Sequence, residues 1–217
     1  MKKSLIGLLA IILGFIEMGC ESHRSASAPA SAPPVANRSS EKEVISEPVN
    51  LGRSSEEVIR QFKSATFADT AFVARAAEMG MAEVMMSMLA EDQAVDPAVK
   101  DFGVAMQAEH RRANSILLNL ANEKKWYTPR DINTEHKDAY DALLQIRSDQ
   151  FDRRYMEQMI RDHEIAAALF GEAVMHARDP DLRRYAVETE PALRDHLTKA
   201  RGIMQKLNPK KQVSVRD

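Results

Sequence analysis

The chain has 217 residues, of which 44% are hydrophobic and 29% are charged, and its formal net charge is -2. This length fits one domain of ordinary size with additional segments. Glycine and aromatic residues are scarce and no basic patch stands out, which favours a helical protein and excludes nucleic acid as an expected partner.

The N-terminal residues have the features of an export signal. Lys2 and Lys3 precede an apolar run from Leu5 to Ile16, which is too short to span a bilayer. Cys20, the single cysteine of the chain, follows directly, and its position is similar to that of the lipidated cysteine of bacterial lipoproteins. We therefore predict that residues 1–19 are a signal peptide and that Cys20 carries a lipid anchor.

Residues 20–53 are rich in Ser, Ala and Pro and lack helical or strand periodicity, which predicts a disordered tether. A lipid on the cysteine would hold the domain at the periplasmic side of a bacterial membrane, and the membrane would be its partner. The alternative is ordinary signal cleavage near Ala26-Ser27-Ala28, which would release a soluble periplasmic protein. No feature of the sequence identifies a protein partner.

Helical periodicity extends from residue 54 to residue 208, which sets the bounds of the predicted domain, and a polar tail follows over residues 209–217. The predicted long helices span about residues 69–91, 97–125, 149–177 and 180–207, and short helices span about 54–64 and 134–147. Asp96-Pro97 and Asp179-Pro180 are typical helix starts, and Ser148 is a candidate cap. These elements predict an all-α fold, an antiparallel four-helix bundle in which the helix over 134–147 closes one end.

A short pattern occurs in two of the predicted long helices. It consists of an aromatic residue, Met, an acidic residue and His, and the two copies are Phe102, Met106, Glu109, His110 and Tyr155, Met159, Asp162, His163. The aromatic ring, the thioether and the imidazole recur every four residues, so they share one face of a helix. Such a face is normally buried, and a buried histidine needs a partner.

Each predicted long helix carries a polar residue on its apolar face, near the middle of its length. These residues are Glu83, His110, His163 and His196. At 1.5 Å per residue they lie roughly 20 Å from their helix starts. Because the midpoints of antiparallel helices of similar length face one another, the sequence predicts a central layer that contains all four side chains.

Two physical accounts of this layer remain open. Three neutral imidazoles and a carboxylate can bind a divalent transition metal such as Zn, Mn, Fe or Cu, with Glu109 and Asp162 as acceptors that orient the imidazoles. Alternatively, no metal binds, and hydrogen bonds between histidines and carboxylates fix the register of the helices. The many methionines could act as soft ligands for Cu(I), but the usual role of methionine is to fill irregular space in a core.

The sequence lacks the residue patterns that several kinds of catalytic site require. The Glu-x-x-His pattern of di-iron bundles is absent, because Gln107, Ile160 and Leu193 stand three residues before the three histidines. No Ser-His-Asp or Cys-His arrangement and no Gly-rich phosphate loop is present. No catalytic residue is therefore predicted, and the sequence favours a non-enzymatic protein.

The chain resembles a family of bacterial outer-membrane or periplasmic proteins of unknown function with a ferritin-like four-helix bundle. The resemblance covers roughly residues 66–207 and rests on the following residues: Phe72-Val73, Glu83, Leu89-Ala90, Met106-x-x-Glu109-His110, Asn114-x-x-Leu117, Phe151-Asp152-x-x-Tyr155, His163 and Pro191-x-Leu193-x-x-His196-Leu197. Met159 departs from the family pattern, which usually has a small aliphatic or polar residue there. The resemblance implies export and the bundle, and it implies no established catalytic activity.

Two main functions follow from these observations, and an oxidoreductase of ferritin-like descent is a third alternative, which the missing di-iron pattern disfavours. The first is a non-enzymatic protein of the cell envelope, lipid-anchored and with a structural or stress-related role. The second is a metal-binding or metal-storage protein that uses the central Glu and His side chains.

Overall fold

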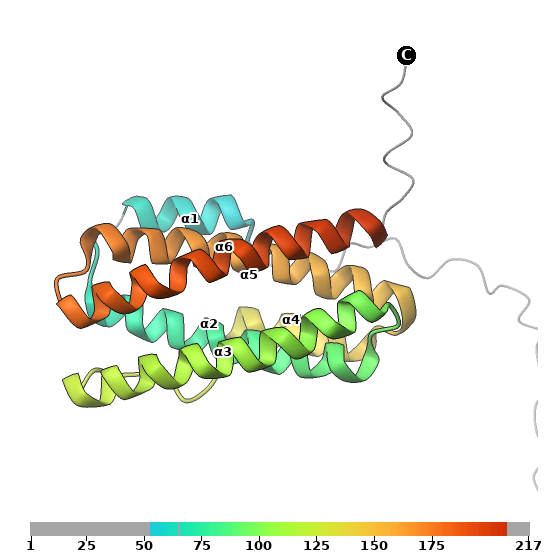
Figure 1. Ribbon diagram of the computed structural model, residues 1–217, viewed down its shortest axis with the longest axis horizontal. Coiled ribbons are helices and arrows are strands. Elements are labelled where there is room, and N and C mark those ends of the chain that lie inside the picture. The colour runs from blue at the N-terminus through green and yellow to red at the C-terminus, as the bar shows by residue number, and fades with distance from the viewer. Residues whose placement is uncertain (1–52, 65, 208–217) are drawn as a thin grey trace, which may run out of the picture. The chain divides into compact units, whose positions relative to one another are not determined.

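A computed structural model describes residues 53–64 and 66–207, and all regular secondary structure in these ranges is helical (Figure 1). The helices are α1 (Ser55–Ser64), α2 (Asp69–Gln93), α3 (Pro97–Lys124), α4 (Thr134–Gln145), α5 (Ser148–His176) and α6 (Pro180–Leu207). Their bounds agree with the predicted ones within two residues, so the predicted helices are confirmed. In the described part of the chain, no helix is long and apolar enough to cross a membrane. The predicted signal peptide, Cys20, nearly all of the tether and the tail over 209–217 lie outside the described residues.

The predicted helix starts at Asp96-Pro97 and Asp179-Pro180 are confirmed. The Asp96 carboxylate accepts the Ala98 N–H at 2.8 Å, and Pro97 begins α3. Asp179 accepts two N–H groups at the start of α6, and Ser54 accepts one at the start of α1. Such caps satisfy N–H groups that have no partner within the helix.

The start of α5 differs from the prediction. Ser148 lies inside the helix with φ 64°, and Arg147 takes the N-cap position without a capping side-chain bond. The Arg147 guanidinium donates instead to the carbonyls of Leu144 and Ile146, at 2.6 and 2.9 Å. This side chain satisfies carbonyls left free at the end of α4, so the sharp turn between the helices depends on Arg147.

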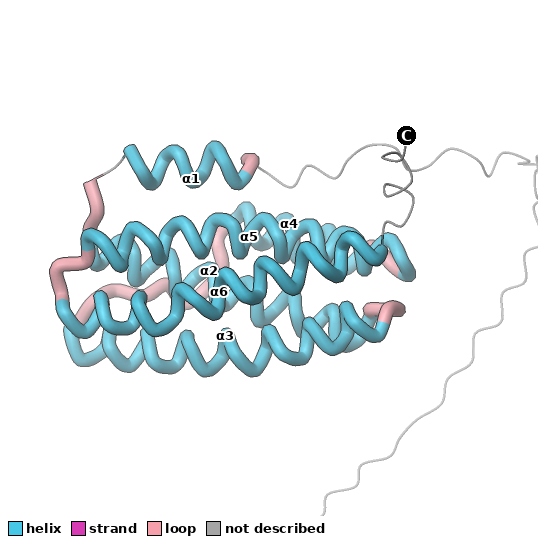
Figure 2. Tube along the Cα trace, turned by 45° about the horizontal axis from the view of Figure 1, so that its top comes forward, coloured by secondary structure: helices cyan, strands magenta, loops and turns pink. Residues whose placement is uncertain are grey.

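The long helices form two pairs, α2 with α3 and α5 with α6, and the three-residue connection of each pair is drawn in pink in Figure 2. These two connections lie at opposite ends of the helices (Figure 1). Each is held by a carboxylate from the other pair. Asp152 of α5 accepts the Val95 and Asp96 N–H groups at 3.1 and 2.7 Å, and Asp69 of α2 accepts those of Arg178 and Asp179 at 3.0 and 2.8 Å.

The pairs also contact each other, α2 with α5 and α3 with α6. The short helix α1 packs on α5. The short helix α4 packs on α2 and α5, so it covers their side and does not close an end of the long helices as predicted. This placement follows from Asn133, the N-cap of α4, whose N–H and side-chain amide donate to Glu78 near the middle of α2, at 2.9 and 3.0 Å.

The buried hydrophobic residues form two clusters, one toward each end of the long helices. Phe72, Phe170 and Tyr185 belong to the first cluster, and Phe102, Phe151 and Tyr155 belong to the second. Along α2 the first cluster ends at Met79 and the second begins at Ala82. Along α5 the second cluster ends at Met159 and the first begins at Ile165. On α3, α5 and α6 the change falls at the predicted histidine, and on α2 it falls just before Glu83, so a polar layer separates the two apolar halves of the core.

Gly103 permits a close approach of α3 to α2. A Cβ atom there would lie 2.8 Å from the Ala90 Cβ and 3.2 Å from the Ser87 carbonyl oxygen. We expect Gly103→Ala to lower the free energy of unfolding by about 1–3 kcal/mol, because the helices would have to separate. Urea unfolding monitored by circular dichroism measures this change.

Gly171 of α5 provides the matched control. A Cβ there meets nothing within 4 Å, so Gly171→Ala should be neutral or should stabilise the protein by up to about 1 kcal/mol through helix propensity. Equal effects of the two substitutions would contradict the close approach at Gly103.

Candidate metal centre

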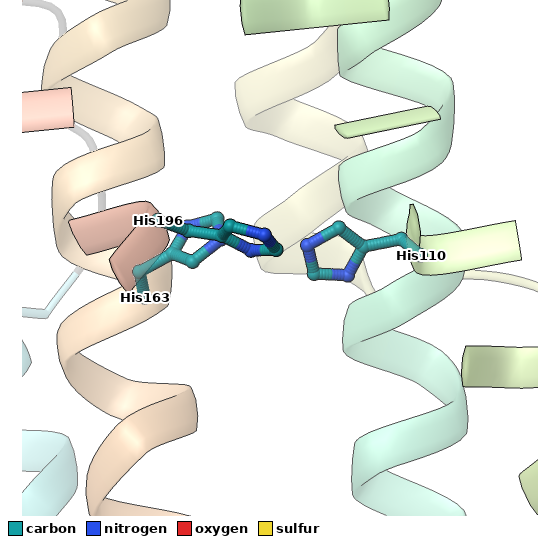
Figure 3. A group of neighbouring side chains, drawn as sticks. All are labelled: His110, His163 and His196. Atoms are coloured by element: carbon teal, nitrogen blue, oxygen red, sulfur yellow. The ribbon is translucent and has the colours of Figure 1, made fainter. Parts of the chain in front are cut away.

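The four predicted polar residues meet between the two apolar clusters. Glu83 comes from α2, His110 from α3, His163 from α5 and His196 from α6. The ring centroids of the histidines are separated by 5.3, 5.4 and 5.3 Å, and one ring nitrogen of each lies within 4.8 Å of the others. Figure 3 shows the His110 ring pointing toward the other two imidazoles.

The centre is almost closed to solvent. The exposed fractions are 2% for Glu83, 6% for His110, 0% for His163 and 3% for His196. Buried polar groups are costly unless each has a hydrogen-bond partner, so the partner of every ring nitrogen matters.

His110 is oriented by Glu83. Its Nδ1–H donates to the Glu83 Oε2 at 2.8 Å, and its Nε2 is buried without a hydrogen-bond partner. One oxygen of Glu83 therefore orients the His110 imidazole, and its other oxygen, Oε1, is buried without a hydrogen-bond partner.

His163 and His196 are oriented in the same manner by different acceptors. The His163 Nδ1–H donates to the Met159 carbonyl at 2.8 Å, with the Glu83 Oε1 at 3.5 Å, and its Nε2 has no partner. The His196 Nε2–H donates to the Glu109 carboxylate at 2.7 Å, and its Nδ1 has no partner. Glu109 thus orients the His196 imidazole.

In all three imidazoles, one nitrogen donates to a fixed acceptor and the other is buried without a hydrogen-bond partner. Leaving a buried polar group without a hydrogen-bond partner costs about 1–3 kcal/mol. Three such nitrogens at one place are therefore unusual in a folded protein. Metal-binding histidines show this division of roles, because the outer acceptor fixes which nitrogen stays free for the ion.

Burial and charge set the protonation of the centre. Burial alone would raise the pKa of Glu83, but the nearby His110 and His163 outweigh it and hold that pKa well below its usual range. Burial opposes protonation of His110, yet the charge and hydrogen bond of Glu83 outweigh it and raise the pKa of His110. Burial lowers the pKa of His163 and His196 despite their nearby carboxylates. The lowered pKa values favour the neutral, metal-binding form of His163 and His196, whereas an ion would have to displace a proton from His110.

Asp162 does not take the position predicted for it. Its two carboxylate oxygens accept from the Gln158 amide at 2.9 and 2.8 Å and from Arg161 at 3.1 Å, and it faces the His136 Nε2 at 3.7 Å. Consecutive residues of an α-helix point about 100° apart, so Asp162 faces α4 while His163 faces the core.

A second buried polar group, which the sequence analysis missed, surrounds His136. His136 lies in the first turn of α4 and is only 6% exposed. Its Nδ1 lies 2.7 Å from Glu78, and its Nε2 faces Asp162, so both ring nitrogens meet carboxylates. Burial lowers the pKa of His136, but the two carboxylates outweigh it and raise the pKa to about 10. The imidazolium therefore joins α4 to α2 and α5.

This raised pKa predicts a pH-dependent contribution to stability. A group whose pKa is raised on folding stabilises fully below its unfolded value of about 6.5 and loses that contribution as the pH rises through its folded value. We expect His136→Gln to lower the free energy of unfolding by about 3 kcal/mol at pH 6, because two buried carboxylates lose their cation. The gap between the wild type and the variant should shrink toward pH 10.

Urea unfolding of both proteins between pH 6 and pH 10 measures this gap, and other alkaline titrations cancel in the difference. A gap that stays constant over this range would show that the positive charge of His136 contributes nothing to stability.

Comparisons with known proteins agree with an all-helical fold. A crystal structure of a DUF305 fragment from Deinococcus radiodurans is similar, with a TM-score of 0.59 and 16% sequence identity over 65% of this chain and 98% of that chain. This likeness concerns the fold alone. No curated protein matches the chain. The model of the domain of unknown function DUF4142 matches residues 56–203, which include all six helices in whole or in part and all four residues of the buried layer. The chain therefore belongs to the DUF4142 family.

Proposed function

We propose that the protein binds one divalent transition-metal ion through His110, His163 and His196. The observation that supports this most strongly is that each of the three clustered histidines has one buried ring nitrogen without a hydrogen-bond partner. In this proposal Glu83 and Glu109 are outer acceptors that hold two of the imidazoles. They are not ligands of the ion.

The ligand set favours some metals over others. Neutral imidazoles suit Zn, Cu and Fe, whereas Mn prefers carboxylate and water oxygens. Methionine ligation of Cu(I) gains no support, because Met79 and Met86 are buried in different apolar clusters and Met88 is 48% exposed. Zn and Fe are the first ions to test, followed by Cu(II).

We further propose an antiparallel ferritin-like bundle in the cell envelope, exported by the signal over residues 1–19 and anchored through Cys20. The reversed order of the two core clusters along neighbouring long helices supports the antiparallel arrangement. Export rests on the sequence alone. A non-enzymatic role in metal binding or storage at the envelope combines both hypotheses drawn from the sequence.

A purely structural layer is the competing function. The Glu83–His110 bond joins α2 to α3, and the Glu109–His196 bond joins α3 to α6, so these pairs can fix helix register without an ion. Under this alternative the three free ring nitrogens have no role.

Elemental analysis of the full-length chain, purified without chelator, separates the two functions. We expect about one equivalent of a transition metal per chain, or full recovery of this stoichiometry when Zn²⁺ is added to the stripped protein. Less than about a tenth of an equivalent, together with no rise in melting temperature on addition of Zn²⁺, Fe²⁺ or Cu²⁺, would contradict metal binding.

A further inference from the structure

A cavity of about 310 Å³ adjoins the histidine centre. Glu83, His110 and His196 line it at the level of the centre, and Asn114, Thr189 and Tyr185 line it farther toward the first apolar cluster. Thr189 and Tyr185 precede His196 by about two and three helical turns, so the cavity extends roughly 10–16 Å along α6. This volume lies at the lower end of the range of small-molecule sites.

The wall of the cavity depends on a glycine. A Cβ at Gly80 would lie 2.2 Å from the Asn114 Oδ1, so only glycine lets the Asn114 side chain lie against α2 at this place. The Asn114 amide gives the cavity hydrogen-bond donors. The Thr189 and Tyr185 hydroxyls also line it, but the Tyr185 hydroxyl donates to the Ala113 carbonyl at 3.4 Å. Met79, Phe170 and Leu193 form apolar wall between them. Mixed walls of this kind are typical of sites for small polar molecules.

The net charge of the proposed metal centre indicates which kind of ligand the cavity would hold. A divalent ion on three neutral imidazoles carries two positive charges, and buried Glu83 balances one of them at short range. Glu109, Glu188 and Arg112 also line the cavity. All three lie at exposed positions, where water screens their charges, and Arg112 offsets one of the two carboxylates. About one positive charge then remains in a buried site, where uncompensated charge is expensive.

We propose that the fourth coordination position of the ion faces this cavity and takes an exchangeable small monoanion with oxygen donors, of the size and charge of a short carboxylate. The inference rests on the metal centre proposed above. Three protein ligands with one open position are the arrangement by which metal sites receive an external ligand, whereas closed four-ligand sites are structural. The cavity reaches two of the three histidines and contains the space and donors that such an anion needs.

The test uses the full-length chain loaded with Co²⁺, whose visible absorption reports the coordination of the ion. Sodium azide should change the spectrum in a saturable way, and acetate should compete with it. Acetamide, which has the shape of acetate without its charge, should compete at least roughly tenfold more weakly.

Substitutions at the mouth of the cavity add a second readout. Ala192 lines the cavity one turn before His196 and is exposed, so Ala192→Phe should cover the mouth without disturbing the core. We expect it to weaken azide binding by roughly tenfold or more while the Co²⁺ stoichiometry stays the same. Ala108→Phe, at an exposed position outside the cavity lining, should leave both unchanged.

The outcomes separate the two proposals. Failure of Co²⁺ to bind would overturn the metal centre and this inference with it. Co²⁺ bound in full stoichiometry with a spectrum that azide does not change would overturn the open position alone. Equal competition by acetate and acetamide, or unchanged azide binding in Ala192→Phe, would overturn the choice of a monoanion or of this cavity, respectively.

Discussion

His163→Ala is expected to abolish metal binding in the working concentration range. Loss of an outer acceptor typically weakens metal affinity 10- to 100-fold, so loss of one of three ligands should weaken it more than about 100-fold. At a free ion concentration of about 100 times the dissociation constant, the wild type gains about 2.7 kcal/mol of stability, and the variant should gain almost none. Thermal unfolding of each protein with and without Zn²⁺ measures this gain.

The gain in stability on adding Zn²⁺ is measured for each protein against the same protein without metal. The comparison therefore remains valid even if His163→Ala is less stable than the wild type. His176→Ala is the matched control, since His176 lies at the end of α5 with a side chain 54% exposed. This control should keep the full gain. An equal gain in His163→Ala would mean that the ion binds elsewhere on the chain.

Glu83→Ala is expected to cause the largest loss of stability in the metal-free protein. Its carboxylate is 2% exposed and accepts from His110, so its removal leaves a buried imidazole without its counter-charge. Removing one partner of a buried ion pair costs about 3–5 kcal/mol. Glu83→Gln keeps an acceptor oxygen for the His110 N–H, so its cost should be about half as large.

Urea unfolding at pH 7.5 in the presence of a chelator measures both variants. Glu123→Ala, at an exposed position of α3, should change the stability by no more than about 0.5 kcal/mol. If Glu83→Ala cost no more than this control, the carboxylate would not be an essential partner of His110.

Glu83→Gln also tests the position of this residue relative to the ion. An outer acceptor that loses its charge should weaken metal affinity by about 10- to 100-fold while the stoichiometry is kept. Loss of a direct ligand should resemble His163→Ala instead.

The helices and their starts were predictable because their signals are local. Asp96-Pro97 and Asp179-Pro180 determine a cap and a first turn within a few residues, and the structure contains both. The prediction of Ser148 as a cap was wrong because the turn before α5 depends on the Arg147 guanidinium. Arg147 contacts the end of α4 and Gln93, and rules based on neighbouring residues do not include such contacts.

The level of the polar layer was also predictable, because residue spacing alone determines height along a helix. The roles within the layer were not, since they depend on which ring nitrogen meets which acceptor across helices. Glu83 and Glu109 both reach imidazoles of other helices, and Asp162, in the same place of the repeated pattern as Glu109, turns toward α4.

The group around His136 escaped prediction because its members are far apart in the sequence. The signal was an isolated acid, Glu78, in an otherwise apolar run from Ala76 to Ala82. A lone carboxylate in such a run requires a buried partner, and α4 supplies it.

The most direct test of the metal centre is a crystal structure of the Zn²⁺-loaded protein with anomalous scattering at the zinc edge. We expect one anomalous peak in the core, about 2.0–2.1 Å from the Nε2 atoms of His110 and His163 and from the Nδ1 atom of His196. A peak at any other place, or a core without a peak in crystals grown with excess Zn²⁺, would contradict the proposed metal centre.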